Sequence, residues 1–118
     1  MRLRGVEIHP LEIPLKKPSL KAKSGRLVGR FVLIRIEAEG GLDGWGEANP
    51  RPDITGETLE TASLVVEKLI APALLGKDVH EIEGLHSAMD RTVELNPSAK
   101  CAVDIAIYDL IGKEYGVS

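Results

Sequence analysis

The sequence has little of several features that identify particular classes of protein. It contains one cysteine, so an internal disulfide framework is excluded, and a reducing, cytoplasmic location is expected. Aromatic residues make up only 3% of the chain, which predicts an aliphatic core. No apolar run approaches the ~20 residues that cross a bilayer, so no membrane partner is expected. Lys and Arg number 15 against 18 Asp and Glu, and the net charge of -3 argues against a nucleic-acid partner.

The first half of the sequence alternates apolar and polar residues in short runs. The period of two that predicts β-strands occurs in residues 2–15, 30–39 and 42–48. Pro10 and Pro14 place the first run at a sheet edge or a strand end. Glu39-Gly40-Gly41 predicts a tight turn between the second and third runs. The glycines on either side of Trp45 indicate a bulge or the close approach of another backbone.

After residue 57 the apolar period changes from two to about 3.6, which predicts helices. One apolar stripe consists of Leu59, Ala62, Val65, Val66, Leu69 and Ile70. Pro72 and Gly76 mark the exit from this first helix. A second helix is expected to begin near Asp78, because Glu81 follows three residues later as in a capping box.

A third helix is predicted to begin at Asn96 and Pro97, as N-cap and first-turn proline, and to end near Gly116. Its apolar residues are Ala99, Ala102, Val103, Ala106, Ile107, Leu110 and Ile111. Because they cover more than one face, we expect this helix to pack against a neighbour outside the 118 residues. Strands followed by helices indicate the α+β class, here a three-stranded antiparallel meander followed by a three-helix bundle.

The residues that carry chemistry do not form a complete catalytic or metal-binding set. The histidines are His9, His80 and His86, and they do not combine with the cysteine in a metal-ligand pattern. We interpret Cys101 as a small buried residue on a helix. Asp104 and Asp109 share the third helix but point in different directions, so a metal-binding pair is not expected. Glu47 ends a predicted strand beside a loop, where it is structural or contacts a ligand.

Two polar segments interrupt the predicted strands and helices. Residues 16–29 are rich in Lys, Gly and Ser, and a long ordered loop of this kind is often a functional lid. The cations in and beside this segment are Lys16, Lys17, Lys21, Lys23, Arg26 and Arg30. Such a cluster attracts an anionic ligand or forms a solvated cationic lid. Residues 49–57 form the second loop, which contains two prolines.

The third helix carries a recognisable pattern. Residues 99–113, AKCAVDIAIYDLIGK, resemble the signature helix of the mandelate racemase and muconate lactonizing enzyme group of the enolase superfamily. Ile107 departs from that signature, which usually has Ala or Leu there. Residues 44–48, GWGEA, resemble the ending of the third strand in the group. Residues 54–57 and 72–77 resemble the branch that contains dipeptide epimerases.

The resemblance implies that residues 1–118 are an N-terminal capping domain and that a catalytic (β/α) barrel lies beyond Ser118. In a complete enzyme the barrel is expected to hold Mg²⁺ on carboxylates and to use lysines that abstract a proton alpha to a substrate carboxylate. No catalytic or metal residue is therefore assigned here, and the isolated chain is expected to be inactive. The implied partners are its own barrel and a small carboxylate or dipeptide substrate, and a homo-oligomer is expected.

In this group the loops at residues 20–27 and 50–56 are expected to fold over the mouth of the barrel and exclude water. The candidate substrate-binding residues are Lys21, Lys23, Ser24, Arg26, Ile54 and Thr55. At Ser24 some L-Ala-D/L-Glu epimerases have an arginine for the distal carboxylate of the substrate, a role that the neighbouring cations could take. Ile54 and Thr55 are the candidates for an apolar wall.

Dipeptide epimerisation is the leading reaction that the resemblance implies for the parent enzyme. Cycloisomerisation of muconate-like acids and o-succinylbenzoate synthesis are the alternatives within the group. The second hypothesis, from another class, is a stand-alone binding domain that self-associates through the third helix. A third is an anion-binding module that uses the first loop.

Overall fold

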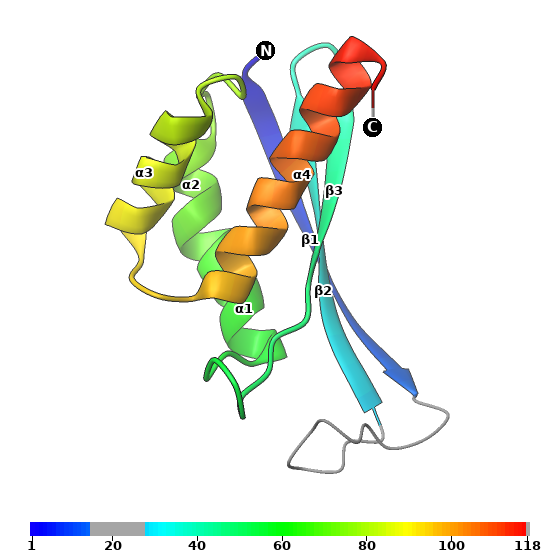
Figure 1. The fold of residues 1–118 in the computed structure, drawn as a ribbon, viewed down its shortest axis with the longest axis vertical. Coiled ribbons are helices and arrows are strands. Elements are labelled where there is room, and N and C mark those ends of the chain that lie inside the picture. The colour runs from blue at the N-terminus through cyan, green and yellow to red at the C-terminus, as the bar shows by residue number, and fades with distance from the viewer. Residues whose placement is uncertain (15–27, 118) are drawn as a thin grey trace.

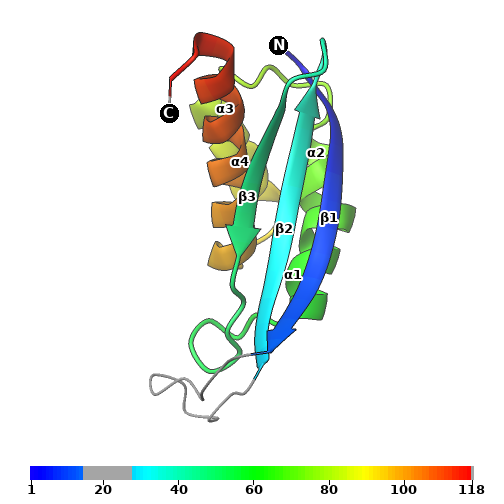
Figure 2. The same ribbon diagram turned by 90° about the vertical axis from the view of Figure 1, so that its right-hand side faces the viewer.

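A three-stranded antiparallel sheet forms one layer of the molecule (Figures 1 and 2). The computed structural model describes residues 1–14 and 28–117. The strands are β1 (Leu3–Pro14), β2 (Val28–Ala38) and β3 (Asp43–Ala48), in the order β1-β2-β3. The three predicted strands are confirmed, and Pro10 and Pro14 lie in an edge strand, where a missing N–H is tolerated.

The helices form a second layer against one face of the sheet, and Figure 2 shows that the other face is left open. They are α1 (Leu59–Val65), η1 (Val66–Ile70), α2 (Ala71–Leu74), α3 (Ile82–Thr92) and α4 (Pro97–Tyr115). This order confirms the predicted α+β class. In the part of the chain that the structure describes, none of the helices has the length and apolar character needed to cross a membrane.

The core between the two layers is aliphatic, as the low aromatic content predicts. Val32, Ile34 and Ile36 of β2 point toward the helices and are at most 1% exposed. Their buried neighbours on the helices include Val66, Ile70, Leu74, Leu85, Val103, Ile107 and Leu110. Burying side chains of this size contributes about 1.5–3 kcal/mol each, so this layer contact is the main source of stability.

Gly44 and Gly46 allow α4 to lie directly against β3. A Cβ atom on Gly44 would overlap the carbonyl oxygen of Ala106, and one on Gly46 would overlap that of Ala102. The close backbone approach predicted beside Trp45 is therefore confirmed. The register of β3 with β2 has no shift, so the alternative of a bulge does not apply here.

One predicted helix boundary is confirmed and one is wrong. The helical run continues from α1 through the π-type turns of η1 and ends at Leu74 of α2, between Pro72 and Gly76 as expected, with Pro72 in the first turn of α2. The second helix, α3, begins at Ile82 rather than near Asp78. The Asp78 carboxylate accepts the backbone N–H of His80 at 3.0 Å, so it closes a local turn and caps no helix.

Most of the apolar residues predicted for the third helix are buried by the chain itself. Those that are at most 1% exposed are Ala99, Ala102, Val103, Ala106, Ile107 and Leu110. These residues therefore give no reason to expect a neighbour outside the chain, because the sheet and the other helices cover them. That the helix packs against such a neighbour stays a prediction.

A different set of α4 residues points to solvent. We name it the outer stripe of α4, and it consists of Cys101, Ile105, Tyr108 and Tyr115. Ile105 is 47% exposed and Tyr108 is 53% exposed. The interpretation of Cys101 as a buried residue is wrong, because it lies on this outward side of the helix.

Candidate functional site

The turn at residues 50–56 follows β3 and is held in shape by Arg51. The Arg51 guanidinium donates to both carboxylate oxygens of Asp53, at 3.1 and 2.9 Å. The Arg51 carbonyl accepts the backbone N–H groups of Ile54 and Thr55, at 3.1 and 2.9 Å. The Thr55 hydroxyl donates to the same carbonyl at 3.4 Å. One residue therefore bonds to three others within the turn.

This turn presents Ile54 to solvent. The Ile54 side chain is 68% exposed, although isoleucine is usually buried. Thr55 beside it is also exposed. Gly56 has a φ of +78°, a left-handed conformation that glycine adopts without strain, and it directs the chain back toward the helices. The predicted pair Ile54 and Thr55 therefore shares one exposed turn.

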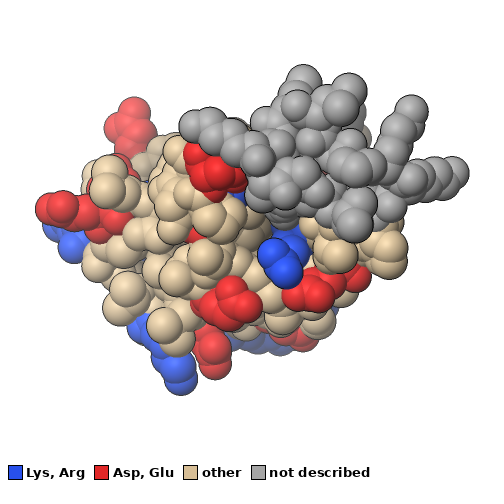
Figure 3. Space-filling model, turned by 90° about the horizontal axis from the view of Figure 1, so that it is seen from below, with Lys and Arg blue, Asp and Glu red and all other residues tan. Residues whose placement is uncertain are grey.

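The turn lies at the end of the sheet where β1 finishes and β2 begins. Pro14 pairs with Val28 at that end, and β3 leaves the sheet through Ala48. Figure 3 views the molecule from this end, where uncharged surface lies between scattered acidic and basic groups. A pocket of about 460 Å³ there is lined by residues of β2, the turn and α1, among them Arg30 and Pro52.

Glu57 fastens the far side of the turn to α4. Its side chain is only 3% exposed, and its two carboxylate oxygens accept the backbone N–H groups of Ser98 and Ala99 at 3.0 and 3.1 Å. These donors belong to the first turn of α4, where N–H groups have no partner within the helix. Asn96 makes no side-chain cap, so Glu57 takes the role that the sequence assigned to Asn96.

The candidate residues of the first loop are not tested by the structure. Lys21, Lys23, Ser24 and Arg26 lie outside the described residues, as do Lys16 and Lys17. Arg30 at the start of β2 is described, and its Nε donates to Glu12 of β1 at 3.3 Å. A role of these cations in binding an anionic ligand stays a prediction.

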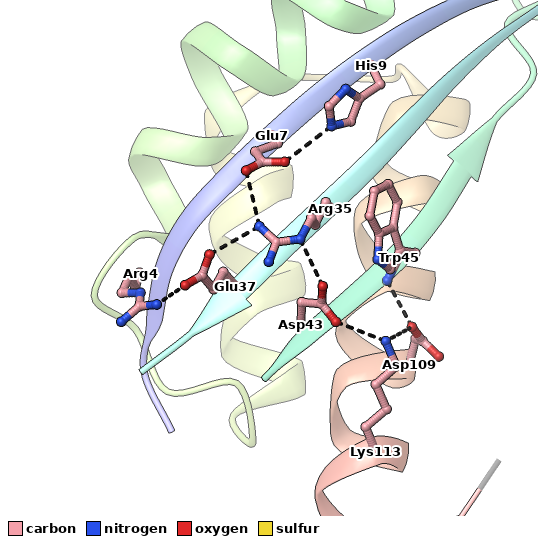
Figure 4. Close-up of polar contacts among 9 residues, drawn as sticks. All are labelled: Arg4, Glu7, His9, Arg35, Glu37, Asp43, Trp45, Asp109 and Lys113. Carbon is pink, nitrogen blue, oxygen red and sulfur yellow. Dashed lines mark hydrogen bonds and ion pairs between the residues drawn. The ribbon is translucent and has the colours of Figure 1, made fainter. Parts of the chain in front are cut away.

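The open face of the sheet carries a polar network centred on Arg35 (Figure 4). Arg35 donates to Asp43 at 2.8 Å and to Glu7 and Glu37 at 3.1 Å each. Lys113 of α4 donates to the same Asp43 carboxylate at 3.1 Å. These bonds lower the pKa of Asp43, chiefly through the Arg35 hydrogen bond, and raise the pKa of Lys113. The network joins all three strands to the last turns of α4.

Aromatic and acidic groups beside this network strengthen the contact between β3 and α4. The backbone N–H of Trp45 donates to Asp109 at 2.9 Å, and Asp109 also pairs with Lys113 at 3.4 Å. The Trp45 ring stacks on His9 of β1, with ring centroids 5.9 Å apart. Asp109 is therefore structural.

Two histidines each form a hydrogen bond to a carboxylate of α4. His80 lies between Asp78 and Glu114, at 2.9 and 2.6 Å, and the Glu114 hydrogen bond is the largest cause of its raised pKa. His86 of α3 bonds to Asp104 of α4 at 2.5 Å, which links these two helices. Within residues 1–14 and 28–117, no group of three or more His, Cys, Asp or Glu side chains could hold a metal ion. Mg²⁺ ligands are therefore not found among them.

Three residues that shape the site were missed by reasoning from the sequence. Arg51 and Asp53 are two apart in a proline-containing loop, a spacing that indicates no particular pairing before the turn is known. Glu57 directly precedes Thr58, the N-cap of α1. An acidic residue at such a position is usually expected to be exposed to solvent. Its partners are more than 40 positions later in the chain, so only the tertiary fold reveals them.

Comparisons with known proteins agree with this architecture. The family described as "Mandelate racemase / muconate lactonizing enzyme, N-terminal domain" matches residues 4–118. The hydrophobic dipeptide epimerase of Enterococcus faecalis is 36% identical over 114 residues, which cover 97% of this chain and 32% of the epimerase. Muconate cycloisomerase 1 of Rhodococcus opacus is 35% identical over 114 residues, covering 95% of this chain and 31% of that enzyme.

The fold of this chain also matches solved structures of the relatives. The crystal structure of N-succinyl Arg/Lys racemase from Bacillus cereus superposes with a TM-score of 0.93 at 29% identity, over 98% of this chain and 31% of that one. The chain thus spans about a third of the length of the relatives that it matches. With the family match over nearly all of its residues, the chain belongs to the mandelate racemase and muconate lactonizing enzyme family, as an N-terminal domain.

Proposed function

We propose that this chain is the substrate-specificity and lid domain of a Mg²⁺-dependent isomerase, and that the parent enzyme is a dipeptide epimerase-like catalyst. Such an enzyme abstracts a proton alpha to a carboxylate. The observation that carries the proposal is the turn at residues 50–56, which holds the exposed Ile54 on a shape fixed by its own contacts. A relative matched over this chain is a dipeptide epimerase solved with Mg and the dipeptide L-Leu-L-Tyr, which supports an apolar contact by Ile54.

The catalytic groups are assigned to the part of the parent that lies outside this chain. The described residues offer no metal-binding cluster, so the Mg²⁺ ligands and the acid/base residues belong, in this proposal, to a catalytic barrel. The outer stripe of α4 is the surface proposed to contact that barrel, because Ile105 and Tyr108 leave apolar area in water. The parent is further proposed to be a cytoplasmic homo-oligomer.

The parent reading frame provides the direct test. Full-length enzyme with Mg²⁺ is incubated in D₂O with dipeptides that vary in their apolar, acidic and basic side chains, and deuterium at the α-carbon is followed by NMR. We expect Mg²⁺-dependent exchange with dipeptides and none with the 118-residue chain alone. Turnover of muconate or formation of o-succinylbenzoate, without dipeptide exchange, would instead support one of the alternatives.

Ile54→Lys tests the role of the turn. Loss of an apolar contact with the substrate is expected to lower kcat/KM for the preferred apolar dipeptide by about tenfold or more. Leu75→Lys is a matched control, because Leu75 is also an exposed apolar residue, 44% exposed, at the other end of the helical layer. Equal kcat/KM values for the two variants would refute the proposed contact.

A stand-alone, self-associating domain is the second candidate, and the outer stripe of α4 is the observation that favours it. Its two most apolar members, Ile105 and Tyr108, are 47% and 53% exposed. Sedimentation velocity of the 118-residue chain tests this candidate. Dimers that Ile105→Lys dissolves would support it, whereas a monomer at all accessible concentrations would exclude it.

A further inference from the structure

Ile54 makes little contact that could orient its own side chain. Its exposed fraction of 68% leaves few neighbours to pack against, so the position of the side chain depends on the backbone beneath it. That backbone is a turn whose first fixed point is Pro50, which is fully buried after β3. Its second is Glu57, which is bonded to α4. Between these two points, contacts within the turn contribute to its shape.

Arg51 takes part in each of these contacts. The guanidinium makes two parallel bonds to Asp53, a geometry that lysine cannot reproduce. The side chains of Arg51 and Asp53 are only 16% and 19% exposed, so water weakens this pair less than it weakens an open surface pair. At the same time the Arg51 carbonyl accepts the N–H groups of Ile54 and Thr55.

We propose that Arg51 is a positioning residue for substrate selection: it holds the turn at residues 50–56 in one conformation and thereby fixes where Ile54 meets the substrate. The inference rests on the proposed function, because it assumes that Ile54 in the turn at residues 50–56 contacts the substrate. A recognition turn that is already ordered loses less conformational entropy on binding, so its apolar contact contributes more to affinity and selectivity. Arg51 acts here through Ile54.

Two measurements test separately whether Arg51 orders the turn and whether that order affects substrate selection. Arg51→Ala and Arg51→Lys are made in the 118-residue chain, and ¹⁵N relaxation gives the order parameters of Ile54 and Thr55. We expect values near those of a rigid backbone, about 0.85, in the unaltered chain and below about 0.6 in Arg51→Ala. Arg51→Lys should give intermediate values, because it keeps the charge without the paired bonds. Arg91→Ala, which removes an exposed arginine from α3, is the control and should change neither residue.

The same substitutions in the full-length parent give the second readout. Arg51→Ala should lower kcat/KM for the preferred apolar dipeptide by about tenfold, with most of the change in KM, and should narrow its preference over charged dipeptides. Unchanged order parameters in Arg51→Ala would overturn the positioning role itself. Lost order with unchanged dipeptide selectivity would overturn the link to substrate selection. The absence of any dipeptide activity in the unaltered parent would refute the proposed function alone.

Discussion

Gly46 and Gly44 are the residues on which the contact between β3 and α4 depends most directly. An added Cβ at Gly46 would occupy the space of the Ala102 carbonyl, which belongs to the backbone of α4 and cannot rotate away. Gly46→Ala must therefore push the helix from the sheet. We expect the free energy of unfolding, measured by urea denaturation, to fall by about 1–3 kcal/mol or more.

Gly5→Ala is the matched control for that substitution. Gly5 also lies in a strand, but a Cβ there would meet nothing within 4 Å. Its unfolding midpoint should stay close to that of the unaltered chain. If Gly46→Ala and Gly5→Ala lose similar amounts of unfolding free energy, the loss comes from replacing any glycine in a strand and not from the close approach of α4.

His80 is a single residue whose charge makes stability depend on pH. Its bonds to Glu114 and Asp78 raise its pKa in the folded chain above the ordinary value of 6.5. The stabilisation is therefore fully present below about pH 6.5 and is lost as the pH rises through the raised value. The free energy of unfolding of the unaltered chain minus that of His80→Gln should be larger at pH 5.5 than at pH 9. A difference that is constant with pH would contradict this role.

At the scale of elements, the start of α4 is stabilised by a residue from another segment. Glu57 accepts two backbone N–H groups of α4 while only 3% exposed, so its loss leaves a buried donor without a partner. Glu57→Gln keeps the shape but turns an N–H₂ toward one of these donors. We expect about 1–3 kcal/mol of destabilisation in urea denaturation.

Glu94→Gln provides the comparison for the capping role of Glu57. Glu94 is exposed just before α4, so the same chemical change there should cost less than about 0.5 kcal/mol. Asn96 was the residue that the sequence favoured as N-cap, but its side chain donates to the carbonyl of Glu94 instead. Equal losses in the free energy of unfolding for Glu57→Gln and Glu94→Gln would contradict the capping role of Glu57.

The continuous helix from α1 through η1 to α2 shows why its buried stripe could be predicted only in part. Its four residues that are at most 1% exposed, Ala62, Val66, Ile70 and Leu74, recur every four positions. This spacing is wider than the 3.6 of an α-helix and is accommodated by the π-type turns of η1. A template with period 3.6 instead assigned Leu69 to the buried stripe, although it is 42% exposed.

At the scale of the whole molecule, the strands and helices that were predicted correctly are those determined by patterns of neighbouring residues in the sequence. The alternation in β2 and the double glycine before β3 specify a meander, and the small residues of α4 specify a helix that lies close to a sheet. The parts not predicted depend on partners distant in sequence, as with Glu57. The candidate site follows the same division: Ile54 and Thr55 were proposed from local resemblance and stay a prediction, whereas the contacts of Arg51 required the folded turn.

The outer stripe of α4 gives a whole-molecule prediction, because Cys101 reports on whatever covers it. In the 118-residue chain its exposed thiol should react with a thiol reagent at nearly the rate of the urea-unfolded chain. In the proposed full-length parent, packing of a second domain on Ile105 and Tyr108 should also cover Cys101, one turn earlier on the same side. Modification of the peptide that contains Cys101, followed by mass spectrometry, should then slow by at least about tenfold. Equal rates in the two proteins would mean that this side of α4 stays in water, and the proposed contact with the barrel would have to lie elsewhere, with the open face of the sheet as the remaining large surface.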